Sequence, residues 1–504
     1  MQLLKRPKRR LVMLFNSGIF LYVFFPVVVV GFFAIGRRNT FAASVWLAAA
    51  SLFFYGWWSV KAVPLLVGSV CCNFAISKYL VPGDGARDVV RYRWLIVAIA
   101  INLIVLAFFK YANFFVANLN SALSSTQFNL LPVLNVALPI GISFYTFTQI
   151  AFLCDCYQGK VRERRFVHYL LFVTYFPHLI AGPVLHHSQM MPQFARNDVY
   201  RPNVDKIAVG FAIFIVGLGK KLLLADPFGA FADPIFEAAR HGTVPSLPGA
   251  WFAVLAYTLQ IYFDFSGYSD MAIGLSLFFG VHLPINFNSP YQALSIIDFW
   301  RRWHISLSDF LRDYLYIPLG GNRLGFGRRY ANVLITMVLG GLWHGANWTF
   351  IIWGAAHGAL LTINHLWRAL RPASHNPRQR SRVRHGLCWA ATFVCVCLTW
   401  VLFKADSVAT AIRIYQGLLG AQVSFEERHF YVVPALALGM IIVLAFPNTQ
   451  TIFGYDPLGS QPIAGGREPL TMSLSRAAIV GLAALFFVST LLIGQPSPFL
   501  YFQF

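Results

Sequence analysis

Long apolar runs alternate with short polar segments along most of this chain. An α-helix needs roughly 20 apolar residues to cross the hydrocarbon core of a bilayer. Runs close to that length predict twelve membrane-spanning helices, at residues 18–36, 41–58, 63–80, 94–116, 136–154, 207–225, 249–282, 331–347, 349–367, 386–404, 430–446 and 477–494. The pattern therefore predicts an all-α, polytopic membrane protein. Because no long polar linker divides the chain, we expect one integral-membrane domain over residues 1–504.

Composition and charge agree with this class. The chain is 57% hydrophobic and 12% charged, whereas soluble domains are roughly 25% charged. A net charge of +21 would indicate nucleic acid as a partner of a soluble protein. Here the basic residues cluster in short loops, as the positive-inside rule expects, so lipid and not nucleic acid is the expected partner.

The basic loops also predict the topology. Segments 87–93, 160–165, 301–329 and 368–384 are rich in arginine or lysine, and they share one side only if the N-terminus is outside. That side is then the cytoplasm. Five basic residues at positions 5–10 indicate the opposite orientation, and this conflict disappears if translation begins at Met13.

Segment 166–194 does not have the pattern of a regular span. It contains Phe176-Pro-His-Leu-Ile-Ala-Gly-Pro183 within an apolar stretch. Broken backbone at membrane depth persists only where protein or a water-filled cavity satisfies its polar groups. We expect either a re-entrant element that reaches a cavity or a helix kinked at Pro177 that lies along the interface.

No metal site is expected. The seven cysteines lie in or beside apolar runs and none has zinc-ligand spacing, so buried apolar packing is the expected role of Cys71, Cys72, Cys154, Cys156, Cys388, Cys395 and Cys397. The chain also lacks a phosphate-binding P-loop, a dinucleotide fingerprint and a nucleophile elbow. These absences argue against ATPase, oxidoreductase and serine hydrolase functions.

His344 is the first candidate for chemistry. It lies in the apolar stretch Leu339-Gly-Gly-Leu-Trp-His-Gly-Ala-Asn-Trp348. An ionisable group at membrane depth indicates a functional site, and a histidine can take a proton from a hydroxyl and return it. A structural histidine bonded to a neighbouring helix is the alternative. Asn347 is expected to orient this imidazole or to bond the turn, and His357 to satisfy a neighbouring helix.

Residues 297–316 have helical spacing. One face carries five large apolar or aromatic side chains, and a second stripe contains Arg301, His304, Ser308 and Arg312. Asp298 is expected to pair with Arg302 one turn later. The segment is either an amphipathic helix at the cytoplasmic interface or a helix tucked beside the site. In the second case its arginines would bind an anionic donor such as coenzyme A, and His304 would be a second histidine of the site.

Two carboxylates lie within the predicted span 249–282. Asp264 and Asp270 fall on different helical faces, which argues against a paired-carboxylate dyad. They are expected to line a polar cavity or to bond broken helices.

Several of these stretches resemble the membrane-bound O-acyltransferase family, in its bacterial branch. They are Met13-Leu-Phe-Asn-Ser, Phe176–Pro183, Asp264-Phe-Ser-Gly-Tyr-Ser-Asp270, Asp298-Phe-Trp-Arg-Arg-Trp-His-Ile-Ser-Leu-Ser308, Tyr316-Ile-Pro-Leu-Gly-Gly-Asn322 and Trp343-His-Gly-Ala-Asn-Trp-Thr349. They cover residues 13–370; residues 371–504 carry no assignable motif, and His186-His187-Ser188 matches only loosely, so no role is assigned there. The resemblance implies a ring of about 11–12 helices around a central tunnel, with His344 catalytic and His304 a second hallmark position.

The implied function is acyl transfer from a thioester to a hydroxyl. We expect O-acetylation of a secreted exopolysaccharide such as alginate, with acetyl-CoA as donor substrate, no bound cofactor, and periplasmic acetyltransferase proteins as partners. Arg301, Arg302, Asn347, Asp264 and Asp270 are the expected substrate-binding residues. The alternatives are D-alanyl transfer from an acyl carrier protein for teichoic acid modification and, in a different class, a transporter or a non-catalytic scaffold of a secretion complex.

Overall fold

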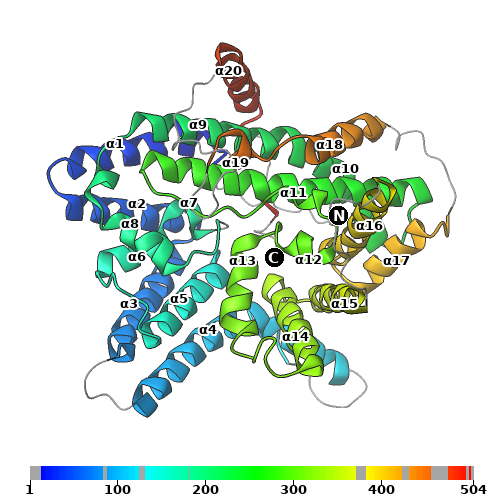
Figure 1. The fold of residues 1–504 in the computed structure, drawn as a ribbon, viewed down its shortest axis with the longest axis horizontal. Coiled ribbons are helices and arrows are strands. Elements are labelled where there is room, and N and C mark those ends of the chain that lie inside the picture. Colours follow the sequence, from blue (N-terminus) through cyan, green and yellow to red (C-terminus); the bar gives the residue numbers. More distant parts are fainter. Residues whose placement is uncertain are drawn as a thin grey trace.

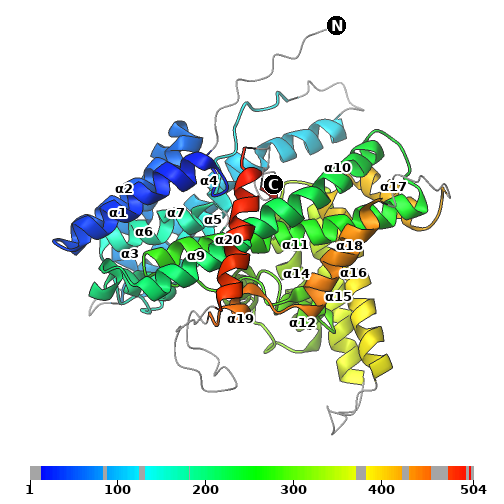
Figure 2. The same ribbon diagram turned by 90° about the horizontal axis from the view of Figure 1, so that it is seen from above.

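The structure is a computed structural model, and it describes residues 13–82, 88–123, 131–180, 182–370, 382–422, 431–455, 475–494 and 499–500. All regular secondary structure in these residues is helical (Figures 1 and 2), which confirms the predicted all-α class. The basic residues at positions 5–10 lie outside the described residues. Met13 itself is buried, and its carbonyl accepts a hydrogen bond from the Trp58 indole at 3.1 Å.

Every predicted span corresponds to a helix. In chain order these are α1 (Phe25–Gly36, continuous with the π-turn η1, Phe20–Phe24), α2 (Thr40–Trp58), α3 (Val63–Leu80), α4 (Asp88–Leu123), α5 (Ile142–Tyr157), α9 (Val204–Gly219), α11 (Leu247–Phe278), α14 (Phe326–His344), α15 (Trp348–Leu370), α16 (Arg382–Lys404), α18 (Val433–Ala445) and α20 (Arg476–Leu491). Figure 1 shows α9 and α11 side by side, with the short helices α12 (Ile296–Trp300) and α13 (Ile305–Leu311) near the middle of the molecule.

Not all twelve helices have the composition of lipid-facing spans. Five described helices are long and apolar enough to cross a membrane, namely Thr40–Trp58, Val60–Leu80, Asp88–Leu123, Val204–Arg240 and Arg382–Lys404, and three shorter apolar ones are Phe20–Gly36, Val433–Ala445 and Arg476–Leu491. Of the other four predicted spans, α5 and α11 are buried along most of their length, whereas α14 and α15 also expose large apolar side chains such as Leu334 and Ile363. Helices shielded by protein need fewer apolar residues than helices in contact with lipid.

The predicted span 207–225 is wrong at its C-terminal end. The helix passes from α9 through the π-turn η4 (Lys220–Ala225) into α10 (Asp226–Arg240). α9 packs closely on α11 because glycines face each other: a Cβ atom at Gly217 would lie 2.6 Å from the Gly267 carbonyl oxygen. Small residues of this kind let two membrane helices approach backbone to backbone.

Segment 166–194 is broken, as its prolines predict. It forms α6 (Phe166–Thr174), α7 (Phe176–Leu179) and α8 (His187–Phe194), and α6 and α7 are almost entirely buried. Ile180, just after α7, lines the same cavity as His344. These positions support the re-entrant element and do not fit a kinked helix lying along the interface.

The expectation for the cysteines is only partly correct. All seven are free thiols, and Cys156 and Cys397 are buried. Cys71 and Cys72 are exposed on α3, and the remaining three are half-buried. Since α3 is one of the long apolar helices, an exposed thiol on it is compatible with contact to lipid. The hydrophobic pattern of a sequence does not distinguish residues that face lipid from residues in the protein core.

Candidate active site

His344 is the last residue of α14 and precedes the turn into α15, as the predicted hairpin requires. Its side chain is buried among aromatic rings, with centroid distances of 4.9 Å to Trp343, 5.2 Å to Trp353 and 5.0 Å to Phe403. The two helices of the hairpin touch through glycine, because a Cβ atom at Gly341 would lie 2.2 Å from the Phe350 carbonyl oxygen. This close packing fixes the position of the imidazole.

His304 lies beside His344, although the helix that was expected to carry it is not continuous. Residues 297–316 form α12, α13 and the π-turn η6 (Arg312–Tyr316), with a break at residues 301–304. His304 has a φ of 43°, a left-handed conformation that is uncommon outside glycine. The break turns its ring inward, where it packs against Phe265 at 4.7 Å and lies 6.5 Å from the His344 ring. The continuous helix was therefore a wrong prediction, while the juxtaposition of the two histidines agrees with the hypothesis of a shared site.

A cavity of about 110 Å³ adjoins His344. It is lined by Lys110, Ser143, Ile180, Trp343 and His344, together with residues 138–142 and Phe144. His304 is not among these residues; its ring lies behind that of His344, 6.5 Å from it. The cavity leads to the imidazole from the end of the molecule at which α5 begins.

Lys110, on α4, was missed by the sequence analysis. Its ammonium group donates hydrogen bonds to the carbonyl oxygens of Trp343 and His344, the latter at 3.2 Å, and to the Ser143 hydroxyl at 3.2 Å. It therefore binds the last carbonyl groups of α14, where a positive charge stabilises a helix terminus. A signal was present, because an ionisable residue inside a predicted span indicates a functional position.

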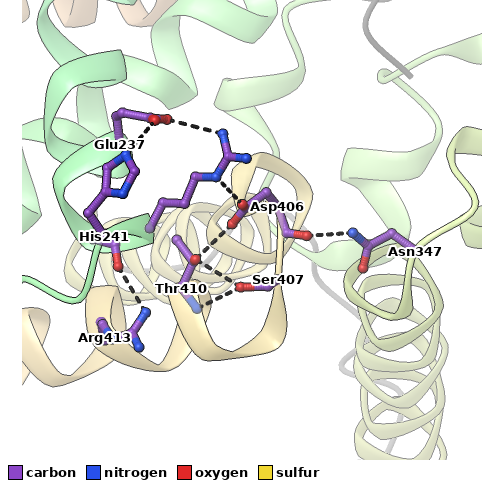
Figure 3. Close-up of polar contacts among 9 residues, drawn as sticks. Glu237, His241, Asn347, Asp406, Ser407, Thr410 and Arg413 are labelled. Carbon is purple, nitrogen blue, oxygen red and sulfur yellow. Dashed lines mark hydrogen bonds and ion pairs between the residues drawn. The ribbon is translucent and has the colours of Figure 1, made fainter. Parts of the chain in front are cut away.

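Asn347 bonds the turn after His344 and not the imidazole. Its amide nitrogen donates to the Asp406 carbonyl at 2.5 Å, and its side-chain oxygen accepts from the Thr349 amide at 3.1 Å. Figure 3 shows the network that continues from there. Asp406 pairs with Arg240 at 2.8 Å and accepts a hydrogen bond from Thr410 at 2.7 Å. Of the two expected roles for Asn347, the structure supports the turn-bonding one.

His357, on α15, has the expected structural role. His357 is buried and its Nδ1 accepts a hydrogen bond from the Trp300 indole at 3.2 Å, which ties α15 to α12.

The arginines near His304 lie at the surface. Arg301 is exposed, and Arg302 forms the expected ion pair with Asp298 at 2.9 Å. Arg312 is paired with Asp309 and Asp313 at 2.6 and 2.7 Å. The expected stripe with His304 is absent from the described helices, because the break sends the arginines outward and the imidazole inward.

Asp264 and Asp270 point in different directions, as predicted, and each belongs to a buried ion pair. Asp264 accepts hydrogen bonds from Lys221 at 2.6 Å and from the Leu500 amide at 3.0 Å. Asp270 accepts from Lys220, Thr449 and Gln450, each at 2.7 Å. Neither carboxylate lines the cavity beside His344. Of the roles expected for these two residues, the contacts agree with bonding broken helices: they join the α9–η4–α10 helix to α11 and to the C-terminal part of the chain, and substrate binding by them stays a prediction.

The region without an assignable motif contributes to the site. Phe403 of α16 packs on His344, and Phe499 stacks on Tyr268 with a centroid distance of 4.4 Å and contacts Phe265 at 6.2 Å. Since Phe265 packs on His304, the C-terminal residues belong to the same core as the two histidines. Hydrophobic side chains that pack over such sequence separations leave no local signal.

Comparison with known proteins agrees with these observations. Residues 50–404 match the model of the membrane-bound O-acyltransferase family. The chain is 43% identical to the peptidoglycan O-acetyltransferase of Helicobacter pylori, over 82% of this chain and 81% of that protein. It is 39% identical to the "Probable alginate O-acetylase AlgI" of Pseudomonas aeruginosa, over 98% of this chain and all of that protein (100%).

A more distant match is the teichoic acid D-alanyltransferase of Streptococcus thermophilus, 30% identical over 49% of this chain and 61% of that protein. The family model spans most of the chain, and the relatives at about 40% identity cover nearly all of it. The chain is a multi-pass membrane protein that belongs to the membrane-bound O-acyltransferase family.

Proposed function

We propose that this O-acyltransferase transfers an acetyl group from acetyl-CoA to a hydroxyl acceptor, for the O-acetylation of a secreted or cell-envelope polysaccharide. The observation that carries the proposal is the buried pair of His304 and His344, with ring centroids 6.5 Å apart and a cavity reaching His344. An imidazole in a space closed to bulk water is suited to moving a proton between two substrates.

His344 acts as the base and then as the acid. Its imidazole takes the proton of the acceptor hydroxyl while that oxygen attacks the thioester carbonyl carbon. A carbon–oxygen bond forms, the carbon–sulfur bond breaks, and the proton passes from the imidazolium to the leaving thiolate. General acid–base catalysis of this kind contributes roughly 10²–10⁴-fold to a rate. Lys110 holds the carbonyl end of α14 and thereby positions His344.

The donor approaches from the end of the molecule that carries the basic loops. Arg329 donates a hydrogen bond to His365 at 2.9 Å, and Arg301 and Arg368 also lie near this histidine. Coenzyme A carries several phosphate charges, and arginine binds phosphate through its planar set of donors. The acceptor approaches through the cavity at the other end, where Lys110 and Ser143 supply polar contacts. This direction of transfer supports our proposal of a bacterial inner-membrane location, with periplasmic acetyltransferase proteins as partners that pass the acetyl group on.

Alginate-like exopolysaccharide is the favoured acceptor, because the alginate O-acetylase relative matches along its whole length. Peptidoglycan is the second candidate, since the peptidoglycan O-acetyltransferase has the higher identity, 43%, over the part it covers. D-alanyl transfer is less favoured, because the D-alanyltransferase relative matches only about half of the chain.

The decisive experiment compares wild type with His344→Gln in proteoliposomes supplied with acetyl-CoA and the periplasmic acetyltransferase proteins of the source cell. We expect His344→Gln to lower thioester cleavage by about 10²–10⁴-fold. His357→Gln is the matched control, because His357 is as deeply buried but is bonded to Trp300. Equal turnover of wild type and His344→Gln would contradict the mechanism. Turnover only with a carrier-protein thioester would contradict acetyl-CoA as donor.

The acceptor is identified in cells that lack their own copy of the gene and carry either wild type or His344→Gln. The acetyl content of the secreted polysaccharide and of peptidoglycan is then measured separately. Loss from the secreted polymer alone supports the favoured acceptor, and loss from peptidoglycan alone supports the second candidate. Unchanged acetylation of both would contradict the proposed pathway.

A further inference from the structure

A cluster of metal-ligating side chains lies outside the candidate active site. Asp155 near the end of α5, His186 at the N-cap of α8 and His187 at its first residue bring one carboxylate and two imidazoles together, with ligand atoms all within 4.8 Å of one another. No role was assigned to His186 or His187 from the sequence. Asp155 precedes them by about 30 positions, and folding brings the three side chains together.

The two neighbouring histidines converge on one carboxylate oxygen. His186 Nε2 lies 2.8 Å from Asp155 Oδ2, and His187 Nδ1 lies 3.0 Å from the same oxygen. These two neighbouring residues reach the same oxygen because His186 uses Nε2, the ring nitrogen farther from the backbone, and His187 uses Nδ1, the nearer one. The other nitrogen of His186, Nδ1, lies 2.7 Å from the Ser188 hydroxyl. A hydrogen bond of this kind on the second nitrogen is typical of a metal-binding histidine, since it fixes the ring orientation.

The charge of Asp155 requires compensation. Its side chain is only 2% exposed. In the described part of the chain no lysine or arginine forms an ion pair with it, and its contacts are His186, His187 and the Tyr314 hydroxyl at 2.6 Å. Buried charges in proteins are normally paired or coordinated to a metal ion. A divalent cation held by the three side chains would provide this compensation.

We infer that Asp155, His186 and His187 bind one divalent transition-metal ion of the zinc type. Two imidazole nitrogens and one carboxylate oxygen suit such an ion better than magnesium or calcium, which prefer oxygen ligands. A tetrahedral zinc ion holds its ligand atoms about 3.3 Å apart, so the present nitrogen–oxygen distances need to lengthen by roughly half an ångström or less.

The surroundings of the cluster allow an ion to enter and supply a fourth polar group beside the three ligands. The His186 side chain is 32% exposed, whereas His187 is 4% exposed. Tyr314, from η6, places its hydroxyl 2.6 Å from Asp155 Oδ2 and 2.5 Å from His186 Nε2, so it is a fourth polar group at the cluster. The ion therefore joins α5, α8 and the segment after α13 at the end of the molecule that carries the basic loops. A zinc ion seated among the three ligands would move the Tyr314 hydroxyl towards the fourth coordination position, where an exchangeable ligand can replace it.

The test is metal binding by the full-length protein in detergent. After treatment with a chelator, the protein is titrated with Zn²⁺, and its bound zinc is measured by elemental analysis after gel filtration. We expect one zinc per chain in wild type and at least a tenfold loss of affinity in His186→Gln. That variant is the decisive one, because His186 is partly exposed and its replacement leaves the core intact. The Co²⁺-loaded protein should show the strong visible absorption of four-coordinate cobalt.

Two further variants separate a metal site from a purely hydrogen-bonded cluster. Tyr314→Phe removes the hydroxyl that contacts Asp155 and His186 but none of the three ligands, so zinc affinity should stay within tenfold of wild type. His241→Gln is the matched control, because His241 forms a 3.0 Å pair with Glu237 at the surface. Zinc binding that is equal in wild type and in the double variant His186→Gln/His187→Gln would overturn the inference. So would a wild-type protein that retains no zinc after gel filtration.

Discussion

Lys110 gives a prediction that concerns a single side chain. Lys110→Met keeps most of the apolar stem but removes the hydrogen bonds to the carbonyl groups of Trp343 and His344 and to the Ser143 hydroxyl. The last turn of α14 then loses its cationic partner, so His344 is held less well in its reactive position. We expect kcat of acetyl transfer to fall by about tenfold to a hundredfold, with a smaller change in KM for the thioester donor.

Steady-state kinetics in proteoliposomes measures both constants. Lys78→Met is the control, since Lys78 is exposed and its ammonium group lies over the Phe74 ring, 5.3 Å from its centroid. A Lys110→Met enzyme with wild-type kcat would contradict the positioning role. Lys110→Arg keeps a cation at this position and should recover part of the rate.

Glu163, in the loop between α5 and α6, gives a prediction about pH. Hydrogen bonds from the Arg165 guanidinium, at 2.9 and 3.0 Å, outweigh the effect of burial and lower the pKa of Glu163 from 4.5 to about 2. Because this pKa is lowered in the folded state, the interaction contributes fully to stability above pH 4.5. The contribution is lost as the pH falls from 4.5 towards 2.

The melting temperature of wild type should therefore exceed that of Glu163→Gln at pH 6, and the difference should shrink below pH 4.5. Arg165→Gln should show the same reduced acid dependence, because Arg165 is the main cause of the lowered pKa. A difference between wild type and Glu163→Gln that stays constant from pH 6 to pH 3 would contradict this assignment.

For single residues, the useful sequence signal was an ionisable side chain inside a predicted membrane span. Sequence reasoning found His344 in this way, and the same rule applied to Lys110 would have found that residue. For Asn347 it included the turn-bonding role but not the partner Asp406, which is 59 positions away. It failed for His186 and His187, because their common partner Asp155 belongs to another helix. Such long-range partners leave no pattern in the local sequence.

At the scale of elements, the π-turn η4 depends on a buried ion pair. Lys220 and Asp270 are 2.7 Å apart, with side chains 14% and 2% exposed, and they join the interrupted helix to α11. Asp270→Asn leaves the lysine charge buried without a counter-charge. Removing one partner of a buried pair costs about 3–5 kcal/mol of stability.

A double-mutant cycle in thermal or chemical unfolding tests this prediction. Asp270→Asn and Lys220→Met should each be destabilising, and the double variant should be more stable than the sum of the two single effects implies. Additive effects would show that the pair does not stabilise the π-turn. Thr449 and Gln450 would then be the main partners of Asp270.

The break between α12 and α13 marks the limit of periodicity as a predictor of elements. Helical spacing places the buried residues correctly, because Phe299, Trp303, Leu307 and Phe310 are all buried. The break at His304 has no glycine or proline to announce it, and its φ of 43° is an unusual conformation that tertiary packing imposes. The twelve spans were predictable because apolar length is a strong local signal. The break that brings His304 to His344 was not predictable, because it depends on tertiary contacts such as the one between His304 and Phe265.

At the scale of the whole molecule, contacts between loops agree with the predicted topology. At one end, Arg91 donates to the Tyr157 carbonyl at 2.6 Å, and Asp155 is joined to Tyr314. At the other end, Arg240 pairs with Asp406, whose carbonyl accepts from Asn347. Each set connects only loops that the prediction assigns to one side of the membrane. The number of predicted spans, the positions of the basic loops and the contacts between loops therefore assign the same loops to the same side of the membrane.

This agreement makes the orientation testable with two single-cysteine variants. In a background without the seven native cysteines, Thr243→Cys lies in the exposed loop between α10 and α11, and Arg323→Cys lies in the exposed segment before α14. The basic loops on the side of Arg323 assign that side to the cytoplasm. A membrane-impermeant maleimide added to intact spheroplasts should therefore label Thr243→Cys, and should label Arg323→Cys only after permeabilisation.

The reverse pattern would place the donor end outside, where acetyl-CoA is absent, and would contradict the proposed direction of transfer. Labelling of both positions from the same side would contradict the span count itself, because six predicted spans precede position 243 and one, at residues 249–282, lies between the two positions.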